Sequence, residues 1–507
     1  MRSLLHVGLI AGASMFAADA FAADWLQWGF EPSHSANNDV EAAVTTANVS
    51  QLVQKYSVTM TDRSNSAPVF AQGITVGANT LDLVFFTAQS GRTTAFDAAT
   101  GSVVWSKTTS GGPSPVEASP AIDPNRQFVY GYGVDGKVHK YAIADGTETT
   151  TGGWPQIATV KPSVEKGASA LAFATSGGIA RLYVVNNGYV GDAGDYQGHI
   201  TTVDLATGAQ RVFNTMCSTL TIHMIQNGQN GVNDCADVQS GIWGRPGATY
   251  DAATDRVYIA TGNGQFNANT GGFNWGDSVL ALHADGTGAG AGLPVDSYTP
   301  TNYAQLDGSD IDLGSASMSI LPAPAASTVQ HIGLQTGKDS KLRLINLDNM
   351  SGSGAAGGVG GAIELINVPI GQSGLKSQPA IWVDTSGDGA TWVYMANSNG
   401  ISGLKLTLTG ANVPHLQPTW QQSSSATSAI VANGIVYHAG SCAGGTCILA
   451  RDPHSGAVLW TSPVIGSMKW QSPILVNGAL YITDQNKKLW KFALPFTDTI
   501  FADSFDG

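Results

Sequence analysis

One stretch in the middle of the chain, residues 241–286, holds side chains whose types and spacing could bind a ligand or a cation. It reads GIWGRPGATYDAATDRVYIATGNGQFNANTGGFNWGDSVLALHADG, with Trp243 on a Gly-rich turn and Asn263 in a Gly-flanked turn after a β-rich run. An Asn in such a turn can direct its side-chain carbonyl at a ligand or cation instead of at its own backbone. The alternative interpretation is structural, with Asn263 as a turn residue and Trp243 in the core. Evidence from the rest of the chain is needed to choose between these two interpretations.

The elements that would position these residues are short strands joined by tight turns. In the middle stretch we expect one strand over Arg256–Ala260 and a second over Ser278–His283. A related pattern recurs along the chain: a β-rich run, then Asp or another polar residue, then Gly two to four residues later. It occurs as AFDAATGSVVW (95–105), YAIADG (141–146), TVDLATG (202–208), ALHADG (281–286), NLDNMSG (346–352), LTLTG (406–410) and ARDPHSGAVLW (450–460). The shortest intervals match the ~40–45 residues of a four-stranded propeller blade.

The repeat predicts an all-β fold, an eight-bladed β-propeller of four-stranded antiparallel blades. Seven turns and a final strand over Leu489–Leu494 make eight units, and residues 25–60 would complete the closing blade and so remove a free sheet edge. Within each unit the Asp would bond backbone N–H groups, the Gly would take a positive φ, and Trp105 or Trp460 would wedge between blades. Seven blades is the competing count.

The composition and the N-terminal segment limit the classes of function and the cellular location that we expect. Only 12% of the residues are charged and 62 are Gly, which suits short strands and turns. The formal charge of −13 argues against nucleic acid as a partner. Residues 1–22 have the pattern of a cleaved signal peptide, and no later segment is apolar enough to span a membrane. We therefore expect a periplasmic or secreted protein, with the propeller over residues 23–496 and an acidic, aromatic tail over 497–507.

The four cysteines allow three pairings, of which we favour the two local ones, Cys217–Cys235 and Cys442–Cys447. Neither pair has the spacing of a zinc site, and no haem-attachment motif is present. The sequence also lacks G-x-S-x-G, H-E-x-x-H and Walker motifs, which argues against the corresponding hydrolases and nucleotide-binding proteins.

Several of these segments resemble the pyrroloquinoline quinone (PQQ) dehydrogenases. Residues 95–105 resemble the tryptophan-docking repeat of that family, and WLQWG (25–29) with ANVSQL (47–52) is similar to its opening. WGRPGATYDAATDRVYIATGN (243–263) is similar to the segment whose Trp lies under the quinone and whose Asn coordinates the cation. The resemblance thus implies these roles for Trp243 and Asn263, although two extra residues stand between Trp243 and Tyr250.

Two further segments imply catalytic residues. SDIDLGS (309–315) is similar to the family segment whose Asp is the catalytic base and a neighbour of the cation, a role that Asp312 fits better than Asp310. GKDSKLRLINLD (337–348) resembles the segment whose basic residue contacts the quinone oxygens, which implies Lys338. The structural alternatives are a strand-end turn for Asp312 and a solvated hairpin lysine for Lys338.

The chain departs from the family in two further places. In GDAGDYQGHITTVDLATG (191–208), Ala193 stands where the family has a carboxylate ligand, so Asp195 or Asp192 would have to replace it, and we assign Asp195. Either carboxylate could instead be simply solvated in this Gly-rich loop. The family's alcohol dehydrogenases also carry a disulfide between neighbouring cysteines over the quinone, and this chain has no adjacent Cys pair.

The resemblance implies a quinoprotein-like oxidoreductase that oxidises a hydroxyl group by hydride transfer to PQQ beside Ca²⁺. Asp312 would be the general base, Trp243 the floor of the quinone and Lys338 its polar contact, with Asp195, Asn263 and Asp312 around the cation. The substrate would be a small-molecule or polymeric alcohol and the electron acceptor a soluble one. The alternative is a non-catalytic propeller scaffold that binds a protein or polymer in the cell envelope. A third, weaker alternative is a sugar- or polymer-binding propeller with hydrolase activity.

Overall fold

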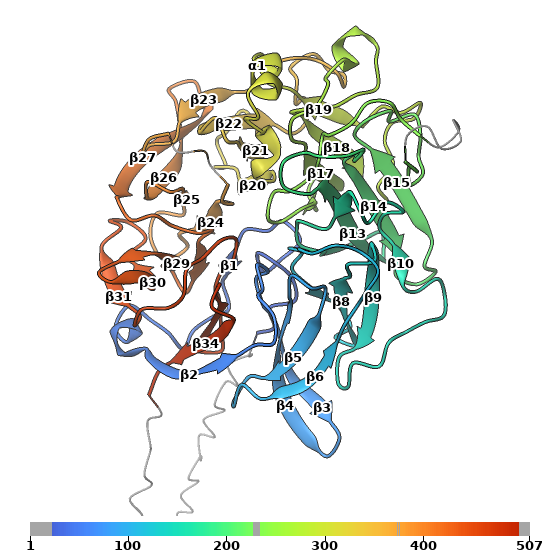
Figure 1. Ribbon diagram of the computed structural model, residues 1–507. Helices are drawn as coiled ribbons and strands as arrows, with labels where there is room; N and C mark the ends of the chain where they lie inside the picture. The colour runs from blue at the N-terminus through green and yellow to red at the C-terminus, as the bar shows by residue number, and fades with distance from the viewer. Residues whose placement is uncertain (1–22, 227–233, 373, 375, 496–507) are drawn as a thin grey trace, which may run out of the picture.

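The eight predicted blades form a ring in the computed structural model, which describes residues 23–226, 234–372, 374 and 376–495 (Figure 1). Each blade is an antiparallel sheet of four strands, with a fifth strand in two of the sheets. The prediction of an eight-bladed β-propeller is therefore confirmed, and the competing count of seven is wrong. The predicted signal peptide (1–22) and tail (497–507) lie outside the described residues.

The first four blades take up residues 69–298. Their strands are β3 (Val69–Val76), β4 (Asn79–Thr87), β5 (Thr93–Asp97) and β6 (Val103–Lys107); β7 (Ala121–Ile122), β8 (Phe128–Tyr132), β9 (Lys137–Ala142) and β10 (Gln156–Ile157); β11 (Glu165–Lys166), β12 (Ala172–Ser176), β13 (Ile179–Gly188), β14 (His199–Asp204) and β15 (Gln210–Asn214); and β16 (Thr249–Asp251), β17 (Arg256–Ala260), β18 (Val279–His283) and β19 (Asp296–Tyr298). The strands β17 and β18 match those expected in the middle stretch.

The other four blades follow, and the N-terminal segment contributes to the last two. Their strands are β20 (Ser319–Pro322), β21 (His331–Thr336), β22 (Lys341–Asn346) and β23 (Glu364–Asn367); β24 (Ala380–Val383), β25 (Thr391–Ala396), β26 (Ile401–Leu408) and β27 (Pro414–Gln422); β28 (Ile430–Ala432), β29 (Ile435–Cys442), β30 (Gly445–Arg451) and β31 (Val458–Thr461), joined by β1 (Asn37–Asn38); and β32 (Ile474–Val476), β33 (Ala479–Thr483) and β34 (Lys488–Ala493), joined by β2 (Val53–Thr59). Short helices are α1 (Tyr303–Gly308) and the 3₁₀ turns η1 (Val49–Gln51), η2 (Ala268–Thr270) and η3 (Leu313–Ser315).

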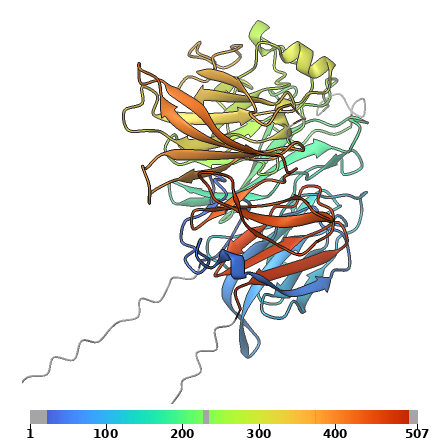
Figure 2. The same ribbon diagram turned by 90° about the vertical axis from the view of Figure 1, so that its left-hand side faces the viewer.

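The ring is closed by the N-terminal segment, as predicted. Strand β2 pairs antiparallel with β34, with Val53 opposite Ala493, so the outer strand of the last blade comes from the start of the chain. Figure 2 shows the blue N-terminal and red C-terminal ribbons side by side. Strand β1 pairs in parallel with β28 and ties the same segment to the seventh blade. Pairing the two ends of the chain completes the last blade and closes the ring.

The repeated turn also fixes how neighbouring blades contact each other. Asp97 Oδ1 accepts a hydrogen bond from the backbone of Ala99 at 2.9 Å, and Gly101 has a φ of +74°. The indole of Trp105 donates to the carbonyl of Ile143 in the next blade at 3.0 Å. A Cβ on the next turn glycine, Gly146, would lie 2.7 Å from the Trp105 ring. The glycine is thus required both for its positive φ and for the close approach of the tryptophan.

The hydrophobic core lies within and between the blades. The middle strands are buried over most of their length, and all five residues of β33 are buried. Because the neighbouring blades cover both faces of a blade, the middle strands consist largely of buried apolar residues. Among the residues that the structure describes, no helix is long and apolar enough to cross a membrane.

Candidate active site at the centre of the ring

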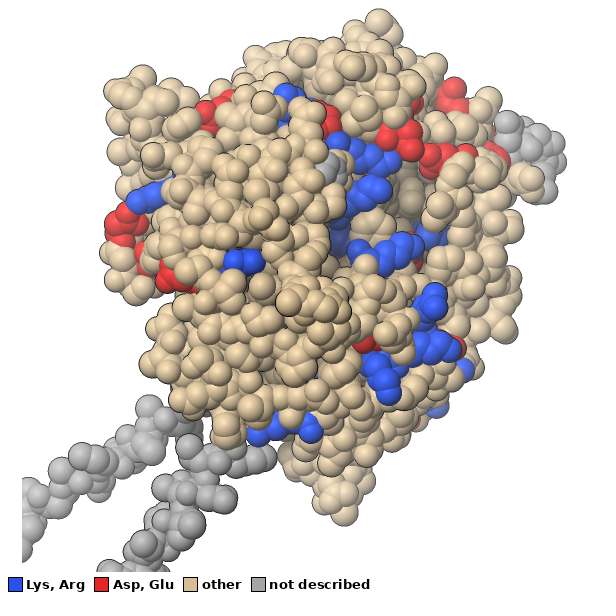
Figure 3. All heavy atoms as spheres, turned by 60° about the vertical axis from the view of Figure 1, so that its left-hand side comes forward, with Lys and Arg blue, Asp and Glu red and all other residues tan. Residues whose placement is uncertain are grey.

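A cavity of about 370 Å³ lies where loops from several blades meet. Its wall includes Trp243, Asn263, Asp312, Lys338 and Trp470, and we call it the axial cavity. These residues come from loops that precede the first strand of a blade or join its second strand to its third. Loops of blades so far apart in a ring can meet only near its axis. Figure 3 shows Lys and Arg side chains gathered around a hollow on one face of the molecule.

The structure brings together four residues singled out in the sequence. Asp312 Oδ1 accepts a hydrogen bond from the backbone N–H of Asn263 at 2.7 Å, and Asp312 Oδ2 forms an ion pair with Lys338. Lys338 Nζ lies 5.3 Å from the centroid of the Trp243 ring. Asp310, the alternative considered, is exposed, also lines the cavity and pairs with Lys338 at 2.7 Å. Asp312 is the carboxylate inside the wall, at 3% exposure.

Local sequence explains why Asn263 and Asp312 can approach so closely. Asn263 follows β17, and Asp312 directly precedes η3, so both are held at the ends of ordered elements. Between them lies Gly262, where a Cβ would stand 2.5 Å from Asp312 Oδ1 and 3.2 Å from the indole nitrogen of Trp243. The glycine of the Thr-Gly-Asn turn therefore makes room for the carboxylate.

Burial and the neighbouring charges set the protonation states in this wall. Burial raises the pKa of Asp312 above its usual range, against the opposing effects of the Lys338 ammonium and the Asn263 N–H. For Lys338 the desolvation that lowers its pKa is outweighed by the carboxylates of Asp312 and Asp310, so the net shift is upward. The lysine therefore stays cationic at neutral pH, beside a carboxylate of raised basicity.

The structure does not bring Asp195 to this cavity. The Asp195 carboxylate accepts a hydrogen bond from Gln197 at 2.8 Å and lies 3.9 Å from Lys161 Nζ, and Asp195 is not among the residues that line the cavity. Asp192, the other carboxylate considered, does line the cavity and accepts a hydrogen bond from the Tyr196 hydroxyl at 2.7 Å. Asp192 therefore joins Asn263 and Asp312 among the oxygen-bearing side chains of the wall, which also include Asp310 and Glu117.

Sequence reasoning missed a charged cluster in the wall of the axial cavity. Glu117 is buried; its Oε2 accepts a hydrogen bond from Lys166 Nζ at 2.8 Å, and its Oε1 from Lys469 Nζ at 2.8 Å and from the Trp470 indole at 3.2 Å. Burial raises the pKa of Glu117, but the cations of Lys166 and Arg245 outweigh it and bring the pKa to about 2. Glu117 and its partners lie far apart along the chain, so no local sequence motif predicts that they meet.

A second missed residue is Asp277, which lies behind Asp312. It is 1% exposed, and its Oδ1 accepts a hydrogen bond from the backbone N–H of Leu313 at 2.9 Å. Burial raises the pKa of Asp277 to about 8, with a further contribution from the carboxylate of Asp312. In the sequence it is only the Asp of a Gly-Asp-Ser turn before β18, and nothing there signals its burial.

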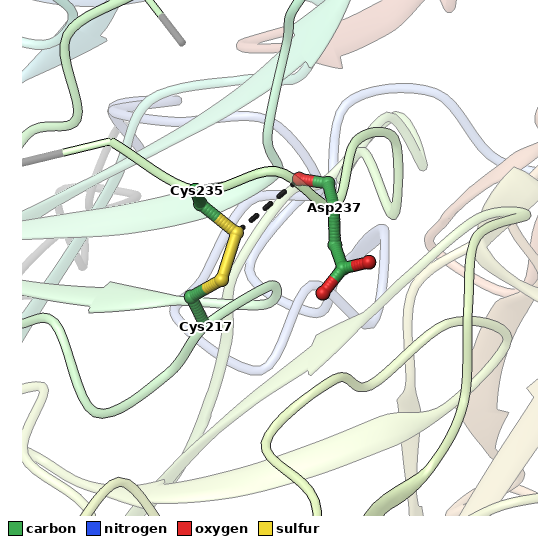
Figure 4. Close-up of side chains that lie close together, drawn as sticks. All are labelled: Cys217, Cys235 and Asp237. Carbon is green, nitrogen blue, oxygen red and sulfur yellow. Dashed lines mark hydrogen bonds between the residues drawn. A yellow bond between two sulfur atoms is a disulfide. The ribbon is translucent and has the colours of Figure 1, made fainter. Parts of the chain in front are cut away.

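Both predicted disulfides are confirmed, as Cys217–Cys235 and Cys442–Cys447. None of the four cysteines lines the axial cavity, so neither disulfide covers it. Figure 4 shows Cys217 and Cys235 beside Asp237, whose carbonyl oxygen lies 3.3 Å from Cys235 Sγ. Sulfurs joined to each other are not thiolates, the form of Cys that binds metals, so this group is not a metal site in its oxidised state.

Comparison with known proteins agrees with the geometry at the level of the fold. Residues 58–307 match a protein-family model described as outer membrane protein assembly factor BamB. No curated protein sequence matches the chain significantly.

Among solved structures, the quinohemoprotein alcohol dehydrogenase ADHIIG from Pseudomonas putida HK5 is similar, with a TM-score of 0.62, 15% identity, and coverage of 96% of this chain and 82% of that one. The quinohemoprotein alcohol dehydrogenase from Comamonas testosteroni has a TM-score of 0.62 and 15% identity, with coverage of 93% and 80%. A europium-containing methanol dehydrogenase has a TM-score of 0.61 and 15% identity, with coverage of 92% and 89%. The chain therefore has the propeller fold of these enzymes.

Proposed function

We propose that the chain is a quinoprotein-like oxidoreductase that oxidises a hydroxyl group, with PQQ bound in the axial cavity beside a divalent cation such as Ca²⁺. The observation that carries the proposal is the ion pair of Asp312 and Lys338 in a cavity wall that also holds Trp243 and Asn263. A base, a cation, an aromatic ring and an amide at one site form the set that such chemistry needs. The fold similarity to quinoprotein dehydrogenases supports the same choice.

The residues present fit the quinone. PQQ is planar and carries three carboxylates, and the half-buried ring of Trp243 offers a stacking surface at the cavity wall. The cations of Lys166 and Lys338 line the same cavity and can pair with carboxylates of the quinone. A volume of about 370 Å³ is within the range of small-molecule sites.

The residues also offer oxygen ligands for a hard cation. Asn263, Asp312 and Asp192 supply amide and carboxylate oxygens, the donors that Ca²⁺ prefers. In our proposal Asp192 replaces Asp195 in the predicted ligand set, because only Asp192 lines the cavity. The cation would also balance negative charge of Asp192 and Asp312.

The roles of the chain's own groups follow from their positions. When bound, PQQ supplies the acceptor for the hydride of the substrate carbon. Asp312 takes the proton of the substrate hydroxyl at a carboxylate oxygen, because it is the buried carboxylate of the wall. Lys338 holds Asp312 in place and stabilises negative charge that develops near its ammonium. The partners would be an alcohol and a soluble electron acceptor, and the two disulfides favour the periplasm or the exterior of the cell.

The second candidate is a scaffold that binds a protein or polymer without redox chemistry. It is favoured by the match of residues 58–307 to the model of an outer-membrane assembly factor. The absence of any cysteine from the wall of the axial cavity points the same way, because the resemblance predicts a disulfide over the quinone.

A reconstitution experiment separates the two candidates. The apoprotein is incubated with PQQ and Ca²⁺, desalted, and assayed for dye reduction with a panel of alcohols. We expect quinone absorbance to be retained and the Asp312→Asn variant to keep the quinone but lose at least ~100-fold in kcat. The control is Asp388→Asn, which removes an exposed carboxylate that pairs with Lys405 on another blade and should change kcat by less than about threefold. Full activity of Asp312→Asn would exclude this residue as the base, and loss of all quinone on desalting would favour the scaffold.

A further inference from the structure

A second cavity, of about 430 Å³, lies beside the axial cavity and shares part of its wall. Arg245, Lys469 and Trp470 line both, so the two cavities meet at these side chains. The remaining wall comes from loops of the sixth to eighth blades and from strands β29 and β30 of the seventh. We call this second cavity the polar chamber.

The polar chamber differs from the axial cavity in the chemistry of its wall. Ser and Thr residues make up much of it, among them Ser425, Thr427, Ser428, Thr446 and Ser467. No Asp or Glu is among its described lining residues, whereas the axial cavity has four. Hydroxyls both donate and accept hydrogen bonds, so this wall suits a ligand rich in hydroxyl groups, and its cations suit a ligand with negative charge.

Arg245 is the group that points to an anion. It is 6% exposed, and its guanidinium lies 4.6 Å from the centroid of the Trp470 ring. It donates one hydrogen bond, to the carbonyl of Trp243 at 3.0 Å, while its buried Nε has no partner in the described part of the chain. Burial lowers the pKa of Arg245 to about 10, because the cation is desolvated. A buried cation with unused donors is stabilised by an anion that enters its cavity.

The nearest carboxylate cannot serve as that anion. Glu117 already accepts hydrogen bonds from Lys166 and Lys469. No ion pair joins Glu117 to Arg245 among the described residues, although its field stabilises the guanidinium. The donors of Arg245 therefore remain available at the junction of the two cavities.

We propose that the polar chamber binds the carboxylate and hydroxyl groups of a polyhydroxylated acid, and that such sugar acids are the substrate class. The inference rests on the proposed function, because it takes the axial cavity as the place of oxidation. The carboxylate of the acid would pair with Arg245 and Lys469, and the Ser and Thr side chains would form hydrogen bonds with its hydroxyl groups. Trp470 would lie between the acid and the axial cavity, because it lines both cavities. A neutral polyol would lack the ion pair.

The test is a calorimetric titration of the apoprotein with D-gluconate and with its neutral counterpart D-sorbitol, so that binding is read without the quinone. We expect gluconate to bind at least tenfold more tightly than sorbitol. Lys469→Gln should weaken gluconate at least fivefold, and Lys405→Gln, a surface lysine paired with Asp388, should leave it within twofold. Equal binding of the two ligands, or no binding of gluconate, overturns the inference.

A second variant places the ligand in the polar chamber. Ser467 is exposed, lines the polar chamber and is absent from the axial wall, so Ser467→Phe should fill the polar chamber and abolish gluconate binding while PQQ is retained. If Ser467→Phe removes PQQ and gluconate alike, the chamber belongs to the quinone and the inference fails. If it leaves gluconate binding intact, the acid binds elsewhere, which also refutes the inference. Gluconate binding in a protein that takes up no PQQ would instead refute the proposed function alone.

Discussion

Replacing Asp277 by Asn should stabilise the protein, and increasingly so as the pH rises. Asp277 is buried behind Asp312, and one carboxylate oxygen accepts a hydrogen bond from Leu313 while the other has no partner among the described residues. Burial raises its pKa to about 8, and nearby carboxylates add to the effect. An Asn has nearly the same shape, keeps the acceptor and carries no charge to bury.

The sign and size follow from proton linkage. Between pH ~4 and ~8 the unfolded chain releases the proton of this carboxyl, whose pKa there is ~3.9, while the folded protein keeps it, so wild-type stability falls as the pH rises. At ~1.36 kcal/mol per pH unit, the loss is about 1.5 kcal/mol at pH 5 and about 4 kcal/mol at pH 7. The variant has no such proton and should be more stable by amounts of this order.

The assay is urea unfolding of both proteins at pH 4, 5 and 7, in EDTA so that no divalent cation neutralises the site. We expect the two proteins to be similar at pH 4 and to diverge toward pH 7. Asp310→Asn, which removes an exposed carboxylate of the same loop region, should stay within ~0.5 kcal/mol of the wild type. A variant as stable as the wild type at every pH, or a gap that does not grow with pH, would refute the reasoning about this buried acid.

Three further results are expected. Gly146→Ala should cost at least ~2 kcal/mol in urea unfolding, because it combines a positive φ with a Cβ 2.7 Å from an indole ring, whereas Gly177→Ala, where a Cβ meets nothing within 4 Å, should cost only ~1 kcal/mol. Equal losses would mean that the tryptophan contact is not tight. Glu117→Gln should destabilise the fold by ~3–5 kcal/mol at pH 7, because it leaves a buried lysine without its counter-ion, and a loss below ~1 kcal/mol in the same unfolding assay would contradict the ion pair. In a thermal-shift titration with Ca²⁺, Asp192→Asn should weaken binding at least tenfold and Asp195→Asn less than threefold, and the reverse order would restore Asp195 as the ligand.

The fold could be predicted from the sequence because a short local turn pattern recurs from blade to blade. The Asp97 and Gly101 pattern forms within a few residues, and its repetition along the chain gave the number of blades and the closure by the N-terminal strand. Asn263 was found in the same way, since its turn directly follows β17. The disulfides also followed from short separations, and both local pairs are present.

The parts of the site that sequence reasoning missed depend on tertiary contacts. Glu117 and Lys166 are 49 residues apart, and only the ring geometry brings them together. The choice between Asp192 and Asp195 depends on which way two side chains of one Gly-rich loop point. Asp192 has a positive φ of 51°, which turns the chain at that residue, and a local pattern does not encode this orientation. The roles of Asp312 and Lys338 came from the family resemblance, and they remain predictions.

The most direct test of the central claim is equilibrium binding of PQQ to the purified apoprotein in the presence of Ca²⁺, followed by tryptophan fluorescence and by the quinone absorbance retained after desalting. The proposed site predicts one PQQ per chain, quenching of indole emission by stacking on Trp243, and at least tenfold weaker binding in the Trp243→Ala variant. No retained quinone with the wild type, or equal retention and quenching in the Trp243→Ala variant, would contradict a quinone site at the axis of the propeller.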